Sequence, residues 1–162
     1  MAYEKVVIIG GGFGGLNAAK ALKSFKGEVY VIDRMNHHLF QPLLYQVATC
    51  ALSPGNIAAP IRDILSNQKN AEVVMGEVDR IDPDANIVHL KDGAQFPFTY
   101  LIVASGARHS YFGHPEWEKD AIGLKTLNDA LTIRDRLLTT FEEAERMDSI
   151  QVGSIIFFFK IG

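Results

Sequence analysis

Three glycines and one acidic residue have the spacing of a dinucleotide-binding motif. Gly10, Gly12 and Gly15 follow the pattern G-x-G-x-x-G, and Asp33 comes 23 positions after the first of them. In this pattern the first glycine allows a tight turn, the second lets a pyrophosphate approach the backbone, and the third lets a helix pack closely on the strands. The acid, expected about 20 residues on, accepts hydrogen bonds from a ribose diol. These residue types predict a site for an adenine dinucleotide.

The elements around the motif must bring its residues to one edge of a sheet. The apolar run at residues 6–9 is typical of a buried parallel strand, and a second such run at residues 29–32 closes on Asp33. Between them we expect a helix that continues through Phe25 and is ended by Gly27. A glycine-rich turn that binds nothing is the plainer interpretation, but the strand, helix and acid in register favour ligand binding. Asp33 also disfavours a 2′-phosphate, so NADP is the least favoured adenine ligand.

The length, net charge and cysteine content of the chain exclude several classes of protein. The chain has 162 residues, a net charge of −3 and one cysteine, Cys50. The length suits one domain, the charge gives no electrostatic basis for binding nucleic acid, and a single cysteine excludes an internal disulfide or a multi-cysteine metal site. The first strand begins within six residues, which leaves no room for a leader, and no apolar run approaches the ~20 residues of a membrane span. We expect a cytoplasmic protein, or one peripheral to a membrane through segments outside this sequence.

The rest of the chain predicts an α/β fold, a Rossmann-type parallel sheet with an inserted β-hairpin. The expected elements are a helix at 58–65 with Pro60 in its first turn, a strand at 72–75 continuing at 78–81, a hairpin of 86–90 and 95–98 around Asp92-Gly93, a buried strand at 100–104, and a helix at 126–146 capped by Thr126 with Asp129. The excursion from Arg34 to Asn70 is far longer than an ordinary connection. Long loops at the carboxyl edge of a parallel sheet tend to hold ligands.

Three segments carry a family likeness. Residues 6–19 read VVIIGGGFGGLNAA, residues 40–54 read FQPLLYQVATCALSP, and residues 100–108 read YLIVASGAR. Together they resemble the flavin-binding portion of the type II NADH:quinone oxidoreductases, which belong to the flavoprotein reductases of the pyridine nucleotide-disulfide type. The first segment is generic to dinucleotide binders, whereas Gln-Pro-Leu-Leu-Tyr-Gln-Val-Ala is the specific one. The resemblance covers about residues 4–146.

This resemblance implies FAD as the cofactor, NADH as the electron donor and a membrane quinone as the acceptor. The motif glycines would meet the FAD pyrophosphate, Asp33 the adenosine ribose, and residues 40–49 would lie near the flavin ring. The cofactor-binding residues that the resemblance implies are Gly10, Gly12, Phe13, Gly14, Gly15, Asp33, Arg34, Leu44, Ala104, Ser105 and Gly106. The family usually has Ala-Thr-Gly at the last three of these positions, and serine keeps the hydroxyl. No catalytic side chain and no metal ligand is expected, because the flavin performs the hydride and electron steps.

The end of the sequence departs from the family. A complete member continues with a second βαβ unit for NADH, returns to finish the FAD domain and adds a membrane anchor. Residues 154–161 resemble the strand that opens the second unit, and Gly162 stands where its first glycine would be. We therefore expect an incomplete FAD-binding domain over residues 1–150, truncated before the second dinucleotide domain. Residues 151–162 would be the start of that missing domain or an altered end.

Three other residues have plainer interpretations than a special chemistry. His37 and His38 could suggest a metal, but no cysteine or carboxylate cluster accompanies them, so a polar loop is favoured. Cys50 stands where the family more often has a small non-thiol residue, and a small buried apolar role is favoured over a redox centre.

Three hypotheses about function stay open. The first is an oxidoreductase segment that passes electrons from NADH through FAD to quinone, with weak or absent turnover by this chain alone. The second is a non-catalytic dinucleotide-binding fragment. The third is another flavoprotein reductase of the same superfamily, although a single cysteine argues against the cysteine-pair chemistry of sulfide:quinone reductases. The expected partners are FAD, a membrane quinone reached through segments outside this sequence and, as an alternative left open, a second copy in a homodimer.

Overall fold

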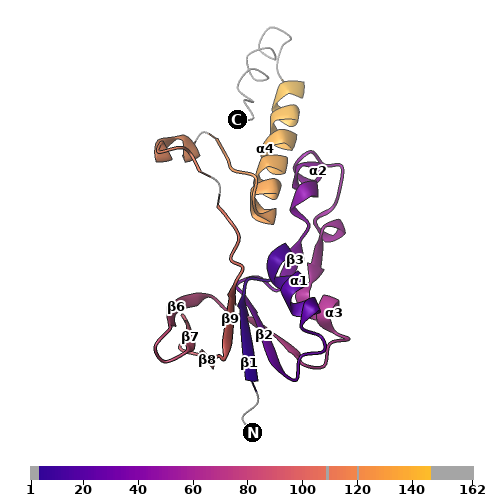
Figure 1. Cartoon of the computed structure of the whole chain (residues 1–162). Coiled ribbons are helices and arrows are strands. Elements are labelled where there is room, and N and C mark those ends of the chain that lie inside the picture. The colour runs from indigo at the N-terminus through magenta and orange to yellow at the C-terminus, as the bar shows by residue number, and fades with distance from the viewer. Residues whose placement is uncertain (1–3, 109, 120, 147–162) are drawn as a thin grey trace. The chain divides into compact units, whose positions relative to one another are not determined.

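The computed structural model describes residues 4–108, 110–119 and 121–146, and Figure 1 shows its elements. The expected boundary at residue 150 and both interpretations of residues 151–162 lie outside the described residues. The chain divides into two units. Unit 1 consists of residues 1–38 and 58–107, and unit 2 of residues 39–57 and 108–162.

The centre of unit 1 is a parallel sheet of four strands. These are β1 (Glu4–Ile9), β2 (Gly27–Asp33), β5 (Ala71–Met75) and β9 (Tyr100–Val103), in the order β5-β2-β1-β9. At its carboxyl end, Ile9 of β1 is opposite Ile32 on one side and Val103 on the other. The chain leaves β1 toward β2 and adds β9 on the opposite side, so the strand order reverses beside β1. Open α/β sheets bind ligands outside the carboxyl ends of the strands at such a reversal.

Alternate residues of β1 face two different layers. Val6 and Ile8 are buried in a cluster with residues of α1 (Phe13–Ala21) and α3 (Ile61–Leu65). Val7 is buried on the other face with Val88 and Leu90 of β7 (Ile87–Leu90). This period of two is the one expected for a strand covered on both sides. Figure 1 shows α1 and α3 on one side of the sheet and β6, β7 and β8 on the other. The predicted α/β fold with a Rossmann-type parallel sheet is confirmed.

The insertion is a three-stranded antiparallel sheet, not the two-stranded hairpin that we predicted. β6 (Val78–Asp82) pairs with β7 instead of continuing β5, and β8 (Gln95–Pro97) pairs with β7 on the other side. The predicted Asp92-Gly93 turn is present: Gly93 has a φ of +92°, and the Asp92 carboxylate accepts a hydrogen bond from the Ala94 N–H at 2.9 Å.

The first helix ends at Ala21, four residues before the predicted end, and Gly27 begins β2 rather than ending the helix. Side chains remote in sequence bind the chain where this helix ends. The Gln68 side-chain amide donates to the Ala19 carbonyl at 2.8 Å, and the Asn70 amide donates to the carbonyls of Leu22 and Phe25 at 2.9 and 3.0 Å. The Ala19 and Leu22 carbonyls also accept from the N–H groups of Leu22 and Phe25, so these side chains add a second partner where the chain leaves the helix.

The predicted helix at 58–65 consists of a short strand followed by a shorter helix. Ala58–Pro60 forms β4, which pairs with β3 (His37–Leu39), and α3 begins only at Ile61. The Ile61 N–H donates to the Asn36 carbonyl at 3.0 Å, which holds the chain extended up to Pro60.

The described part of unit 2 is mainly helical. They are η1 (Gln41–Leu43), α2 (Leu44–Ala48), η2 (Pro54–Asn56), η3 (Pro115–Lys119) and α4 (Leu127–Glu145). The predicted capping box of α4 is confirmed: the Thr126 hydroxyl accepts from the Asp129 N–H at 3.1 Å, and the Asp129 carboxylate accepts from the Thr126 N–H at 2.8 Å. The core of the unit joins α2 to α4 through the buried side chains Leu44, Val47, Ala48, Ile57 and Ala130.

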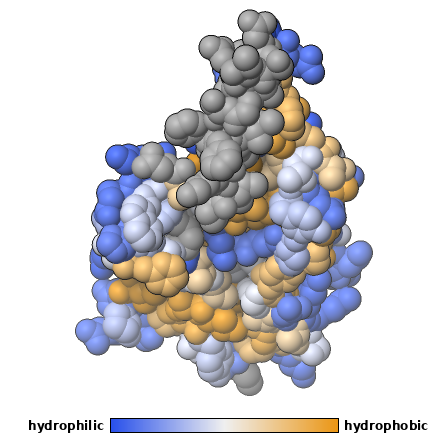
Figure 2. Space-filling view, turned by 90° about the horizontal axis from the view of Figure 1, so that it is seen from above, coloured by the Kyte–Doolittle hydropathy of each residue, from blue (hydrophilic) through white to orange (hydrophobic). Residues whose placement is uncertain are grey.

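Apolar side chains also reach the surface. The two edge strands of the parallel sheet expose Met75, Tyr100 and Val103, and unit 2 exposes Phe112 and Phe141. Apolar areas are visible among the polar residues in Figure 2. Within the described residues no further strand pairs with β5 or β9, so the sheet has apolar side chains at both of its edges.

Candidate functional site

The loop between β1 and α1 depends on the absence of side chains at two positions. Gly10 has a φ of +105°, and a Cβ on it would overlap the carbonyl oxygen of Ala104. A Cβ on Gly15 would overlap the carbonyl oxygen of Gly10. A larger residue at either position would push α1 or β9 away from the loop. The tight turn predicted at Gly10 and the close helix packing predicted at Gly15 are both present.

The glycine lip, residues 12–14, is the exposed junction between this loop and α1. All three residues are exposed, whereas Gly11 and Gly15 on either side are buried. A Cβ on Gly12 would meet nothing within 4 Å, and a Cβ on Gly14 would meet only the Ala104 Cβ at 3.6 Å. Gly12 is the N-cap of α1, no side chain caps this helix, and its first turn holds no acid. Such a helix start attracts anions, so the lip fits the pyrophosphate of a dinucleotide.

Asp33 ends β2 and faces the glycine loop. Its Oδ2 accepts a hydrogen bond from the Gly11 N–H at 2.5 Å, and its Oδ1 accepts from the Met35 N–H at 2.8 Å. An ionised carboxylate has about four acceptor positions, so about two are left for ribose hydroxyls. The structure thus adds a role that the sequence did not indicate, because Asp33 also anchors the loop. Its contact with a ribose stays a prediction.

The residues after β9 border the loop from the other side. The Ala104 N–H donates to the Ile9 carbonyl at 2.7 Å, which extends the pairing of β9 with β1 by one bond. Ser105 and Gly106 are exposed, and Gly106 turns the chain with a φ of +75°. The structure therefore brings residues 104–106 to the same edge as the glycine lip, and their contact with a dinucleotide stays a prediction.

The remaining predicted residues differ in what they can contribute. Phe13 opens α1 and is 43% exposed, and Arg34 is exposed directly after Asp33. Leu44 belongs to unit 2 and is only 2% exposed, because its side chain packs into the α2–α4 core. Its next neighbour Tyr45 is 54% exposed. A contact of Leu44 with a cofactor stays a prediction, but core packing already accounts for its side chain.

Cys50 is exposed, so the expectation of a small buried residue is wrong. Thr49 is the C-cap of α2, and Cys50 follows it with a φ of +65°. A left-handed residue just after a helix turns the chain away from the helix axis. This turn carries the Cys50 side chain out of the core that α2 forms.

His38 is the residue at this site that the sequence interpretation missed. It lies in β3 and not in a polar loop. Its Nδ1 is 3.2 Å from the carbonyl oxygen of Gly11, and its ring meets the Phe13 ring edge-on with centroids 4.8 Å apart. No local signal could have found this contact, because it joins residues 27 positions apart.

The described residues also bear on metal binding and on membrane insertion. They contain no group of three or more histidine, cysteine, aspartate or glutamate side chains arranged to hold a metal ion. Within the same part of the chain, no helix has both the length and the apolar character needed to cross a membrane.

Comparisons with known proteins agree with this geometry. A profile of the pyridine nucleotide-disulphide oxidoreductase family matches residues 4–151. The chain is 50% identical over 146 residues to the type II NADH:quinone oxidoreductase Ndh of Mycobacterium tuberculosis, and 54% identical over 145 residues to NdhA of the same organism. Each match spans 88% of this chain, but only 32% and 31% of these relatives. The chain thus spans about a third of the length of the curated relatives that it matches.

Solved structures share the fold. NDH2 from Plasmodium falciparum in complex with NADH superimposes with a TM-score of 0.80 at 27% identity, over 89% of this chain and 30% of that one. The sulfide:quinone oxidoreductase from Aquifex aeolicus gives a TM-score of 0.77 at 26% identity, over 86% of this chain and 32% of that one. The glycine loop, the sheet order and the family match over nearly all of the described residues lead to one conclusion: this chain belongs to the pyridine nucleotide-disulphide oxidoreductase family.

Proposed function

We propose that this chain is the FAD-binding portion of an NADH:quinone oxidoreductase, with residues 1–150 as its dinucleotide-binding domain. The observation that carries the proposal is the uncapped glycine lip at the carboxyl edge of the parallel sheet, with Asp33 beside it. The choice of reaction is supported by the identity of 50% and 54% to two type II NADH:quinone oxidoreductases.

The proposed roles follow from the chemistry of each group. Backbone N–H groups at the start of α1 hold the pyrophosphate, and the helix dipole adds roughly 0.3–1 kcal/mol to that attraction, or up to about 2 kcal/mol when the anion is partly buried. The acceptor positions left on Asp33 hold the ribose hydroxyls, and Ala104, Ser105 and Gly106 form the opposite border of the site. The flavin, when bound, supplies the hydride and electron chemistry, while the protein binds and orients it.

Partners and location are further parts of the proposal. NADH and a membrane quinone are the proposed substrates of the whole protein, because the names of the Mycobacterium tuberculosis relatives pair these two. We place the protein in the cytoplasm or at the cytoplasmic face of a membrane, where an enzyme that joins these substrates would work. A homodimer is the assembly that we propose to test alongside them.

A sulfide:quinone reductase is the second candidate, favoured by the TM-score of 0.77 to the Aquifex aeolicus enzyme. Two observations weigh against it. The chain has one cysteine, and sulfide chemistry in that family uses a pair. The identity to that enzyme is 26%, about half of the identity to the NADH:quinone oxidoreductases. A non-catalytic dinucleotide-binding fragment is the third candidate.

The absorbance spectrum of the purified chain, mixed with FAD and freed of excess, tests the proposal. We expect a retained flavin band, which shows that the chain binds the cofactor. Bleaching of that band by NADH would support the oxidoreductase, whereas a retained band that NADH does not bleach would favour the binding fragment. Bleaching by sulfide and not by NADH would favour the second candidate. A chain that is folded by circular dichroism but retains no flavin would contradict the proposal.

A further inference from the structure

The Gly11 residue of the loop is held at both of its backbone polar groups. Its N–H donates to Asp33 Oδ2 at 2.5 Å, and its carbonyl oxygen lies 3.2 Å from His38 Nδ1. A carbonyl oxygen only accepts hydrogen bonds, so the Nδ1 of His38 carries the proton in this contact. Phe13 fixes the plane of the imidazole, because the two rings meet at 89°. Two side chains from different strands therefore fix one glycine.

Holding Gly11 sets the direction of the amide groups on either side. The carbonyl of Gly11 and the N–H of Gly12 belong to one planar trans peptide and point in opposite directions. With its carbonyl held by His38, the Gly11–Gly12 peptide must aim its N–H away from that ring. Gly12 is the exposed start of the glycine lip, where a Cβ would meet nothing within 4 Å. The orientation of the amide that opens the lip thus depends on the imidazole.

The hydrogen bond from His38 matters because the backbone here is a run of glycines, which is more flexible than other sequences. Residues 10–12 are all glycine, and glycine visits conformations that side chains forbid elsewhere. Without the hydrogen bond from His38, the Gly11–Gly12 peptide could rotate, and its N–H would face the lip for only part of the time. An anion that binds this N–H would then bind more weakly, because only a fraction of the loop would be competent.

We propose that His38 is a positioning residue that orients the Gly12 amide for the diphosphate of an adenine dinucleotide. This inference rests on the proposed function, since it assigns the diphosphate to the glycine lip. The inference makes a specific prediction: the hydrogen bond from His38 Nδ1 should affect the binding of the diphosphate and not the binding of the adenosine.

Three substitutions separate this role from a general effect on folding. In His38→Asn the side-chain amide nitrogen can occupy the place of Nδ1 and donate to Gly11. In His38→Gln the donor moves to the place of Nε2, and in His38→Leu there is no donor. His37→Gln is the matched control, because His37 is the neighbouring imidazole and its Nδ1 contacts Asn36 at 3.2 Å, not the loop.

Affinity is measured by calorimetry with FAD, and by displacement with ADP and with adenosine, which lacks phosphate. We expect His38→Gln and His38→Leu to bind FAD and ADP about 5- to 10-fold more weakly, as for the loss of one hydrogen bond. Adenosine should change less than about 2-fold, and His38→Asn and His37→Gln should behave like the wild type. Amide exchange in the ligand-free protein gives a second readout: the Gly11 N–H, which donates to Asp33, should exchange faster in His38→Gln but not in His38→Asn. Urea unfolding of each variant checks its stability.

The outcomes are distinct. If the wild type binds FAD and His38→Gln binds it equally well, the inference is wrong while the proposed function stands. The inference is also wrong if His38→Gln weakens the binding of ADP and of adenosine equally. It is wrong as well if His38→Asn binds FAD as weakly as His38→Gln does. A wild type that binds neither FAD nor ADP overturns the proposed function and this inference together.

Discussion

The glycine lip of unit 1 and the α2–α4 core of unit 2 are built on opposite principles. The lip presents backbone at the exposed start of α1, and what shapes it is the absence of side chains at Gly10, Gly12 and Gly15. The core of unit 2 consists of buried side chains such as Leu44 and Ala130, contributed by helices more than 80 positions apart. Added side-chain volume should disrupt the first region, and removed side-chain volume should disrupt the second.

This difference explains what each region shows in its sequence. A site made of backbone requires glycine at fixed positions, so it is visible as a motif. A core made of side chains accepts many apolar residues, so its sequence indicates a helix face but not the helix that covers it. We therefore expect larger side chains to destabilise the glycine loop and smaller side chains to destabilise the α2–α4 core.

The largest effect is expected for Gly15→Val. Its Cβ would overlap the carbonyl oxygen of Gly10, and a backbone atom can move only if α1 moves with it. We expect the free energy of unfolding to fall by about 3 kcal/mol or more, at the upper end of overpacking effects. Urea denaturation measures it. A loss below about 1 kcal/mol would mean that the helix does not depend on this close approach.

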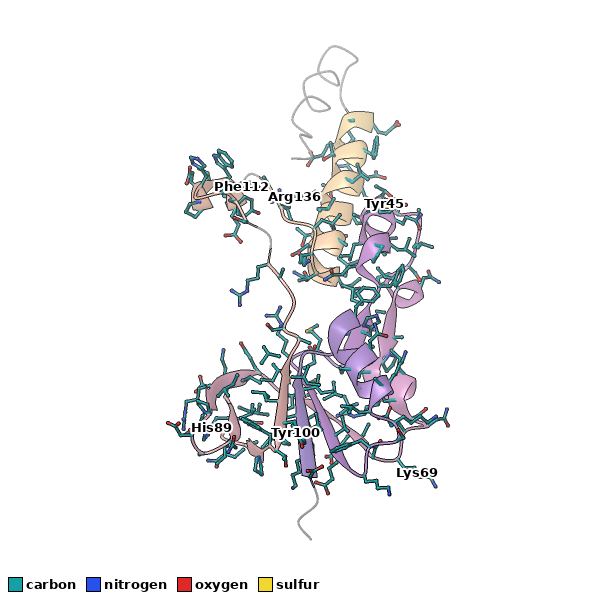
Figure 3. The ribbon with its side chains drawn as sticks, in the orientation of Figure 1. Tyr45, Lys69, His89, Tyr100, Phe112 and Arg136 are labelled. Carbon is teal, nitrogen blue, oxygen red and sulfur yellow. The ribbon has the colours of Figure 1, made fainter. Side chains whose placement is uncertain are left out.

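Leu44→Ala tests the other region. Removing a side chain that is 2% exposed should lower the free energy of unfolding by about 2–4 kcal/mol through lost burial and the cavity left behind. The control is Tyr45→Ala, since Tyr45 projects from α2 at 54% exposure (Figure 3) and should cost less than about 1 kcal/mol. If Leu44→Ala left stability unchanged but abolished FAD binding, the role of Leu44 would be in the cofactor site and not in the core.

The parts of the fold that the sequence predicted are those fixed by neighbours along the chain. The glycine turn, the Asp92-Gly93 turn and the Thr126–Asp129 capping box each join residues a few positions apart, and all are present. The motif glycines, Asp33 and residues 104–106 also lie at one edge of the sheet, whereas their contact with a cofactor stays a prediction.

The features that were missed depend on residues far apart in the sequence. At the early end of α1 the amides of Gln68 and Asn70 bind carbonyls of the helix and of the turn after it, 45 to 49 positions away. The anchoring of Gly11 by Asp33 and by His38 is remote in the same way. Such contacts follow from the folded topology, so no periodicity or local motif could have indicated them.

Gln68→Leu gives an intermediate effect and tests this explanation. The buried Gln68 amide donates to the Ala19 carbonyl at 2.8 Å, and leucine would leave that carbonyl without this partner. We expect a loss of about 1–3 kcal/mol in the free energy of unfolding. Lys69→Leu is the control, because the adjacent Lys69 is exposed (Figure 3) and should change stability by less than about 0.5 kcal/mol. Equal effects of the two variants would contradict a specific role for Gln68.

The smallest effect is a pH dependence at the amino end of the sheet. The Lys5 ammonium, 3.2 Å from Glu28, and the Tyr30 hydroxyl, at 3.1 Å, hold the pKa of the Glu28 carboxyl below its ordinary value. A lowered folded-state pKa stabilises the fold above the ordinary glutamate value, and this contribution disappears as the pH falls through the folded-state pKa. Glu28→Gln should therefore flatten the stability profile slightly between about pH 5 and pH 3, as urea midpoints would show. A profile unchanged by Glu28→Gln would mean that solvent screens this pair completely.

The most direct test of the account compares two exposed glycines. A Cβ on Gly12, in the lip, or on Gly55, in η2 of unit 2, would meet nothing within 4 Å, so Gly12→Val and Gly55→Val should both fold with little change in stability. The measurement is the equilibrium affinity of each variant for FAD. The account predicts that Gly12→Val loses affinity by about 100-fold or more, because its side chain occupies the space where the diphosphate approaches the backbone, while Gly55→Val keeps the wild-type value. A Gly12→Val protein that binds FAD as tightly as the wild type would contradict the assignment of the diphosphate to the glycine lip.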